Sequence, residues 1–280
     1  MRKWADFFEA GGVGFHAWCV NRGHDPITEA RMCSDALNSG ARSMYFDLET
    51  PEGRFYWHGS NEDALTFGAE LRRLQPMAHL VVAPDARPWK VKEVPLAEFA
   101  SFSDAVAPQL YWEIFNSPAN FKLLADYGYH AGPEGMTPEL ALNAANGALA
   151  KFGLPVRPIG GGAAKVDEWH RFVSHAYSLG MPSVSVWRYG TATSPLLPAL
   201  QGMPAPQPVV PPVDVSVQTA PQASPAAVPA AASASNEPAQ PTEAKQDEAV
   251  QALKTQKPAA KRERRLSDLW RSLGSDRSKR

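Results

Sequence analysis

Short apolar segments alternate with longer amphipathic segments along residues 1–200, and this alternation constrains the fold more than any other feature of the chain. Strands that are separated by helices pair in parallel through right-handed crossovers. The apolar segments are short, as expected for strands that are covered on both faces. The sequence therefore predicts an α/β domain with six strands, at residues 13–20, 43–48, 79–83, 106–112, 156–159 and 183–187.

Helices are predicted between these strands and before the first of them. Residues 2–10 form a lone amphipathic helix at the start of the chain. Asp25 is a good N-cap for the next helix, because its side chain can accept a free backbone N–H and Pro26 lacks an N–H to satisfy. The predicted helices cover residues 2–10, 26–38, 61–74, 96–101, 118–127, 138–152 and 166–179.

Six strands are two fewer than a TIM barrel requires. We predict a TIM-barrel-like (β/α) domain that lacks the first two strands, and a six-stranded open sheet is the structural alternative. The barrel interpretation carries a functional expectation, since the active sites of barrel enzymes lie at the carboxyl ends of the strands.

The composition changes sharply near Gln201. Residues 202–256 are rich in Pro and Ala, lack aromatic side chains and are typical of a disordered spacer. The tail, residues 257–280, holds nine Lys or Arg residues against three acidic ones, although the whole chain has a net charge of −1. The barrel domain is therefore predicted to cover residues 1–201, and its acidic character argues against nucleic acid as its main ligand.

The basic tail could fold into a short helix. Leu266, Leu269, Trp270 and Leu273 recur at helical spacing, with arginines between them. Such a helix would bind an anionic surface (membrane, cell-wall polymer or nucleic acid) or a partner protein. The alternative is a solvated tail that is only transiently helical, because so short a helix is marginal in water.

Two carboxylates end the second predicted strand. Asp47 and Glu49 are separated by one residue, so both side chains project from the same face of the strand. Paired acids at a strand end are suited to general acid/base chemistry. The alternative is that they cap the following helix or pair with an arginine.

Polar and aromatic residues gather at the ends of the other predicted strands. They supply aromatic faces for stacking on sugar rings and polar groups for sugar hydroxyls, so we predict a carbohydrate cleft. The candidate substrate-binding residues are His16, Trp18, Tyr45, Asp85, Arg87, Gln109, Tyr111, Glu113, Trp187 and Tyr189.

Ordinary structural roles stand beside several of these assignments. Trp18 and Trp187 could belong to the core, and Arg87 could simply neutralise a nearby acid. His16 could be a hydrogen-bonded core residue, and Glu113 could cap a helix.

The sequence lacks the motifs that are typical of several other catalytic chemistries. The chain has no H-E-x-x-H, no paired-Cys metal spacing and no G-x-S-x-G, and Gly160-Gly161-Gly162 lacks a phosphate-loop pattern. We therefore predict no metal and no cofactor, and expect these glycines to allow close approach of substrate or of a neighbouring loop. Cys19 and Cys33 are expected to be two buried thiols, because a domain of this size needs no disulfide.

The motif order resembles that of a known enzyme family. Asp47-Leu48-Glu49, the later Gln109-Leu110-Tyr111-Trp112 and the final Trp187-Arg188-Tyr189 are similar to the motifs of family 25 glycoside hydrolases, the Chalaropsis-type lysozymes. The resemblance covers roughly residues 12–190 and implies a TIM-like barrel with Asp-x-Glu on its fourth strand. It implies that Glu49 is the general acid and that Asp47 orients or stabilises. The aspartate that this family carries on its first strand has no counterpart here.

The favoured hypothesis is hydrolysis of O-glycosidic bonds in a bacterial-type glycan such as peptidoglycan. A non-catalytic glycan-binding protein on the same scaffold and an adaptor that acts through the basic tail are the alternatives. The first residues lack the apolar core of a signal peptide, and no segment approaches membrane-spanning length. The sequence as written thus predicts a cytoplasmic protein, whereas a longer N-terminus would fit export to the cell wall.

Overall fold

A computed structural model describes residues 1–51, 55–192 and 195–201 of the chain. The described residues all fall within the unit Met1–Val213. The predictions of a spacer at 202–256 and of a basic helical tail at 257–280 lie outside the described residues.

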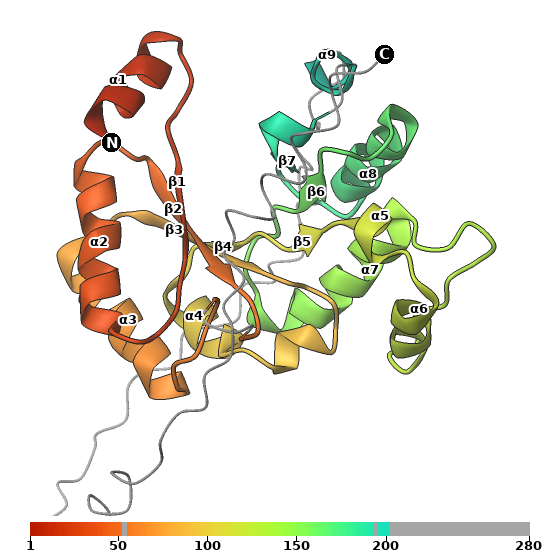
Figure 1. Ribbon diagram of the computed structural model, residues 1–280, viewed down its shortest axis with the longest axis horizontal. Helices are drawn as coiled ribbons and strands as arrows, with labels where there is room; N and C mark the ends of the chain where they lie inside the picture. Colours follow the sequence, from red (N-terminus) through yellow and green to blue (C-terminus); the bar gives the residue numbers. More distant parts are fainter. Residues whose placement is uncertain (52–54, 193–194, 202–280) are drawn as a thin grey trace, which may run out of the picture. The chain divides into compact units, whose positions relative to one another are not determined.

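Two groups of parallel strands form the centre of the fold (Figure 1). The first group has the order β1-β2-β3-β4, and the second has the order β5-β6-β7. Every pairing is parallel, which confirms the α/β class. The strands are β1 (Ala17–Val20), β2 (Ser43–Leu48), β3 (His79–Pro84), β4 (Ala105–Val106), β5 (Gln109–Leu110), β6 (Ile159–Gly161) and β7 (Ser185–Trp187).

Isolated parallel bridges join the two groups. Asp85 pairs with Gln109, and Val106 pairs with Val156. Strands β4 and β5 are therefore two parts of the single strand predicted at 106–112, which is interrupted around Pro108, a residue without an N–H to donate. The prediction of six successive strand positions is confirmed, but this interruption was missed, β1 begins later than predicted, and β6 overlaps its predicted range only at Ile159.

Helices separate the strand positions as predicted. The α-helices are α1 (Arg2–Ala10), α2 (Pro26–Asn38), α3 (Asn61–Leu74), α4 (Leu96–Phe102), α5 (Trp112–Phe115), α6 (Pro118–Ala125), α7 (Pro138–Leu149), α8 (Val166–Ser178) and α9 (Leu196–Gln201). Single 3-10 turns are η1 (Lys90–Lys92), η2 (Ala150–Phe152) and η3 (Tyr189–Thr191). The predicted cap of α2 forms, since Asp25 Oδ1 accepts the Thr28 N–H at 3.0 Å. Thr137 caps α7 in the same way, and its Oγ1 accepts the Leu140 N–H at 3.2 Å.

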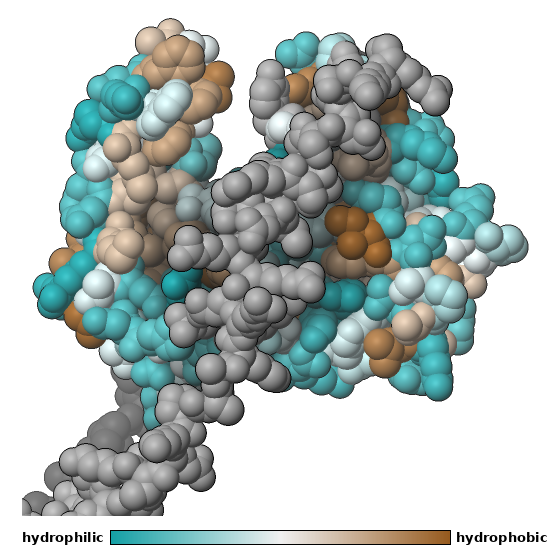
Figure 2. Space-filling view, viewed as in Figure 1, coloured by the Kyte–Doolittle hydropathy of each residue, from teal (hydrophilic) through white to brown (hydrophobic). Residues whose placement is uncertain are grey.

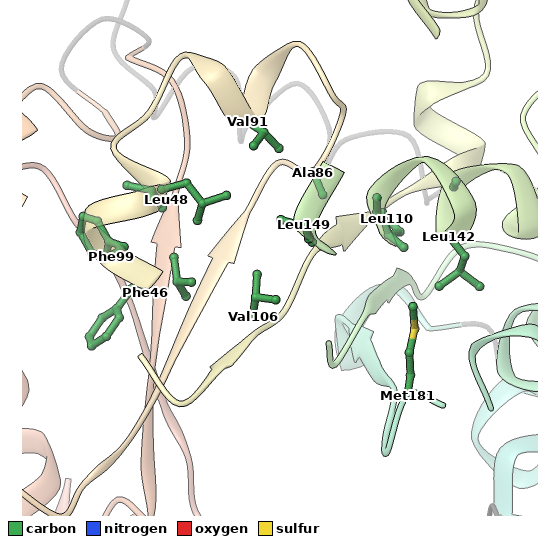
Figure 3. Packing of buried hydrophobic residues seen from close by; sticks show 14 of the residues in the cluster. Phe46, Leu48, Ala86, Val91, Phe99, Val106, Leu110, Leu142, Leu149 and Met181 are labelled. Atoms are coloured by element: carbon green, nitrogen blue, oxygen red, sulfur yellow. The ribbon is translucent and has the colours of Figure 1, made fainter. Parts of the chain in front are cut away.

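The strand residues divide between two apolar clusters because alternate side chains point to opposite faces. The larger cluster lies between the strands and the helices, and it contains Phe46, Leu48 and Phe99 from the first group of strands and its helices (Figure 3). It continues without a break to Leu110 and Leu142 near the second group. One core therefore supports both groups of strands.

The smaller cluster occupies the opposite face of the strands. It consists of Val81, Ala83, Ala105, Ala107 and Ile159, with Tyr45 and Tyr111 packed against it. The residues are mostly small, as expected for the inside of a narrow, curved sheet where strands crowd together. This inner face is the one that leads to Asp47.

Part of the surface is apolar. Brown and tan residues cover the α1 region in Figure 2, and Trp4, Phe7 and Phe8 of this helix are exposed. Among the described residues, no helix combines the length and the apolar character needed to cross a membrane.

Candidate active site

A cavity of about 370 Å³ lies at the carboxyl ends of the strands. Its lining comes from both groups of strands and from the loop that follows β2. The lining residues are Trp18, Val20, Asp47, Glu49, Phe55, Tyr56, Ala83, Gln109, Tyr111, Ile159 and Trp187.

The strand register explains why the acids reach this cavity. Val20 pairs with Asp47, and Asp47 pairs with Ala83, so these three residues lie at one level of the parallel sheet. Asp47 follows Tyr45 on the inner face, and Glu49 continues that face just beyond the strand. The predicted same-face arrangement of Asp47 and Glu49 is present.

Gln109 holds Asp47 in place. Its Nε2 donates to Asp47 Oδ1 at 2.6 Å and to the Ala83 carbonyl oxygen at 3.1 Å. Its Oε1 accepts the Tyr111 hydroxyl proton at 2.9 Å. Because both the oxygen and the nitrogen of its amide have partners, Gln109 has one defined orientation. It therefore holds the carboxylate of Asp47 in one position at the base of the cavity.

Asp47 and Glu49 interact through their carboxyl groups. Burial and, to a smaller extent, the charge of Glu49 raise the pKa of Asp47 to about 7, although the Gln109 hydrogen bond lowers it. Burial also raises the pKa of Glu49. Two adjacent buried carboxylates cannot both ionise cheaply, so the pair shares a proton near neutral pH.

Two indoles meet at the edge of the cavity. Trp18 on β1 and Trp187 on β7 have ring centroids 5.2 Å apart at an interplanar angle of 41°. They are 45% and 39% exposed, so they are not core residues. Among the described strands, β1 pairs only with β2 and β7 only with β6, and this side-chain contact brings the first and last strands together.

Asp85 and Arg87 form their own pair beside the cavity. The Arg87 guanidinium donates to both carboxylate oxygens of Asp85 and, at 3.3 Å, to Asn120 Oδ1. It also lies over the Phe115 ring, 4.4 Å from the centroid. Neither residue belongs to the cavity lining, and the neutralising role weighed for Arg87 fits this geometry.

His16 and Tyr45 lie closer than Asp47 to the amino ends of the strands. His16 Nδ1 is 2.6 Å from the hydroxyl of Ser43, the first residue of β2, so it lies at the opposite end of the sheet from Glu49. Burial and the nearby Arg42 lower the His16 pKa. Tyr45 packs against the inner cluster one layer below Asp47. Neither residue lines the cavity.

Glu113 and Tyr189 complete the predicted set. Glu113 lies in the first turn of α5, where burial raises its pKa, and its Oε2 has no hydrogen-bond partner among the described residues. It is not part of the cavity lining. The side chain of Tyr189 lies outside the described part of the structure.

The sequence interpretation missed Phe55 and Tyr56, which line the cavity from the loop after β2. The signal that could have identified them is the long connection between Leu48 and Asn61, which carries three consecutive aromatic residues. Long loops at the carboxyl ends of barrel strands commonly form the walls of active sites.

The three glycines after Pro158 serve packing. A Cβ on Gly160 would lie 2.7 Å from Trp169 Cη2, and one on Gly162 would lie 3.0 Å from the Arg188 carbonyl oxygen. Of the two uses predicted for these glycines, close approach of a neighbouring loop is the one observed.

A second cavity of about 480 Å³ lies away from the strand ends, beside Trp57, η1 and Phe152. Its charged lining residues are Lys92, Glu93, Glu98 and Lys151. It is larger than the strand-end cavity, but its two carboxylates each have another partner: Glu93 pairs with Lys90 at 2.6 Å, and Glu98 accepts from Asn61 Nδ2 at 2.7 Å. The paired acids therefore favour the strand-end cavity as the candidate active site.

No protein-family model matches the chain, and no curated protein matches its sequence. Solved structures of similar fold include a glycoside hydrolase family 18 N-acetylglucosaminidase from Paenibacillus barengoltzii, with a TM-score of 0.54 and 10% identity over 72% of this chain and 86% of that one. Active domain 2 of a Pyrococcus furiosus chitinase gives a TM-score of 0.44 and 12% identity over 66% of each chain. The catalytic domain of a family 18 chitinase from the fern Peteris ryukyuensis gives 0.42 and 13% over 66% of this chain and 65% of that one.

The first of these similarities supports the coarser prediction of a TIM-barrel-like α/β fold. At this identity the similarity concerns the fold alone. The assignment to family 25 in particular stays a prediction.

Proposed function

We propose that the chain is a glycoside hydrolase that uses Glu49 as its general acid. The observation that carries this proposal is the contact between the carboxyl groups of Asp47 and Glu49 at the floor of an aromatic-walled cavity. General acid catalysis of glycosidic bond cleavage requires a carboxyl group that keeps its proton near neutral pH. The shared proton of this pair meets that requirement.

Glu49 is better placed than Asp47 to donate the proton. Asp47 is only 5% exposed, and Gln109 holds its Oδ1. Glu49 is one methylene longer and more exposed, so its carboxyl group can reach a glycosidic oxygen. Asp47 then takes up the negative charge that develops in the pair, stabilised by the Gln109 amide.

The contact between the two carboxyl groups also limits the mechanism. Retaining enzymes with a carboxylate nucleophile place their two carboxyl groups about 5–5.5 Å apart, and inverting enzymes about 6.5–9.5 Å apart. Asp47 is only 5% exposed and its Oδ1 is held by Gln109, so it is poorly placed to act as a nucleophile or as a base for water. Asp47 and Glu49 are the only carboxylates that the described residues contribute to the lining. A neighbouring group on the sugar therefore supplies the nucleophile.

A 2-acetamido group is the sugar substituent that serves this purpose in substrate-assisted glycosidases. We therefore propose glycans that contain N-acetylhexosamine, a class that includes peptidoglycan and chitin. The family 18 enzyme of similar fold is itself an N-acetylglucosaminidase. Trp18, Trp187 and Tyr111 would contact the apolar faces of the sugar rings.

The test compares two tetrasaccharides with the same β-1,4 linkage, chitotetraose with acetamido groups and cellotetraose without them. We expect hydrolysis of chitotetraose and of peptidoglycan, and none of cellotetraose. Glu49→Gln should lower the rate by about 10²–10⁴-fold and leave binding intact, since the amide keeps the shape of the side chain. Binding is measured in parallel by titration calorimetry.

Two outcomes contradict the proposal. Binding of chitotetraose without turnover in the unmodified protein would leave a non-catalytic glycan-binding protein. Equal hydrolysis of cellotetraose would exclude participation of the acetamido group. An adaptor function of the basic tail concerns residues outside the described part of the chain.

A further inference from the structure

Two thiol groups lie in contact next to the candidate active site. Cys19 Sγ on β1 is 3.7 Å from Cys33 Sγ on α2. Both are free thiols, and Cys33 is buried as predicted, whereas Cys19 is only partly buried. They are the only two cysteines of the chain, and the proposed hydrolysis uses neither of them.

We propose that Cys19 and Cys33 form a disulfide-forming modification site that cross-links strand β1 to helix α2. The oxidant is a small-molecule disulfide. The thiolate of one cysteine attacks it and releases one thiol, and the second cysteine then attacks the mixed disulfide and releases the other. Two protein thiols are oxidised and one external disulfide is reduced to two thiols, so electrons and protons balance.

The geometry needs little change. A disulfide has an S–S distance of about 2.05 Å, so the sulfur atoms must approach by about 1.7 Å from their present contact. Rotation about the two Cα–Cβ bonds moves sulfur atoms over such a distance. Cys19 Sγ also donates to Asn21 Oδ1 at 3.4 Å, a weak bond that the approach would replace.

The position gives the bond a mechanical effect. Cys19 lies between Trp18 and Val20, which both line the strand-end cavity. Strand β1 has a strand partner on one side only among the described residues. A bond to α2 would therefore hold the less supported strand of the first group, together with two residues of the cavity wall.

The surroundings keep the Cys19 thiol protonated in the absence of oxidant. The hydrogen bond with Cys33, burial, and the charges of Glu29 and Asp47 all raise the pKa of Cys19. Because thiolate is the attacking species, oxidation should accelerate as the pH rises.

The test uses the full chain with oxidised glutathione, followed by alkylation and intact mass measurement. We expect a monomer that has lost two hydrogen atoms and takes up no alkylating reagent. Its melting temperature should rise by about 5–10 °C and fall again with dithiothreitol. Cys33→Ser is the matched control, and it should end as a mixed disulfide with glutathione without the increase in melting temperature.

Refolding the reduced chain in a glutathione buffer removes any barrier to access, because both thiols are exposed during refolding. Two alkylatable thiols in the refolded monomer would overturn the proposal. A disulfide-linked dimer, or two glutathione adducts on one chain, would overturn it as well.

Discussion

The two groups of strands use different means to hold their functional side chains. Strands β2 and β3 are each six residues long and pair over their whole length, from Ser43–His79 to Leu48–Pro84. Strands β5, β6 and β7 are two or three residues long. The first group therefore places Asp47 and Glu49 through a long backbone ladder, whereas the second has few ladder bonds.

Side-chain packing compensates in the second group. Trp169 Nε1 donates to the Gly161 carbonyl oxygen at 3.0 Å, and the Trp112 ring lies 5.6 Å from the Trp169 ring. Gln109 and Trp187 are thus held by short strands that lie on a dense aromatic layer. The first group thus depends more on backbone hydrogen bonds between strands, and the second more on the packing of aromatic side chains.

The largest loss of stability is expected for substitutions in the core, and these substitutions test whether the two groups of strands share one core. Phe46 is fully buried and contacts the rings of Phe67, Phe99 and Phe102 at centroid distances of 5.3–6.2 Å. Phe46→Ala should lower the free energy of unfolding by about 3–5 kcal/mol. Phe172→Ala in the second group should shift the same single transition, measured by urea unfolding. Two separate transitions would show that the groups unfold independently.

The second prediction concerns pH and the first group. The pKa of Asp47 is about 7 in the folded chain and 3.8 as an isolated group. Its contribution to stability is therefore fully present below about pH 4 and is lost as the pH rises through about 7. Asp47→Asn removes this loss, so the variant should gain on the order of 2–4 kcal/mol relative to the unmodified protein between about pH 4 and pH 8.

Urea unfolding at a series of pH values measures this difference. The counterpart in the second group is Glu113→Gln, where burial and, more weakly, the charge of Glu168 raise the pKa without a side-chain hydrogen bond to a second carboxyl group among the described residues. The pH dependence should change less in that variant. An equal change in both variants would contradict the importance of the Asp47–Glu49 contact.

The third prediction tests close packing in the second group. A Cβ on Gly160 would meet buried rings at 2.7–3.0 Å, on Trp169 and Trp112. Gly160→Ala should therefore cost about 1–3 kcal/mol of stability, measured by thermal unfolding. Gly132→Ala is the control, since no atom lies within 4 Å of its added Cβ, and it should change stability by less than about 0.5 kcal/mol.

The smallest effects should be alike in the two groups. Asp25 caps α2, and Thr137 caps α7, each through one hydrogen bond to a backbone N–H. Asp25→Ala and Thr137→Ala should each cost about 1 kcal/mol. The conservative variants Asp25→Asn and Thr137→Ser keep an acceptor oxygen and should retain most of the stability in the same measurement.

The sequence predicts the first group well because its signals are local. Alternation of Met44, Phe46 and Leu48 with Tyr45 and Asp47 identifies β2, its two faces and the direction of the carboxylates. Helix caps such as Asp25 are equally local. The six strand positions and their parallel order followed from this reasoning, and the structure contains them.

The features that the sequence did not predict depend on tertiary contacts, and local sequence patterns give no information about such contacts. Spacing places His16 on the same face as Trp18, but a strand rises about 3.3 Å per residue, so His16 lies toward the amino ends of the strands and away from the cavity. The division of the strand at Pro108 depends on which backbone groups of the adjacent strands are available for hydrogen bonding. The contact between Trp18 and Trp187 joins residues 169 positions apart in the sequence, and no spacing argument predicts it.

That contact between two indoles also makes the cavity visible by optical methods. The intense far-ultraviolet transition dipoles of indole rings whose centroids are 5.2 Å apart at 41° couple strongly, and a tilted pair gives a two-signed band in the far-ultraviolet circular dichroism spectrum. A sugar ring that seats against either indole changes their mutual angle and hence the amplitude of the band. The protein therefore carries an intrinsic reporter of cavity occupancy, which needs no label and is read without turnover.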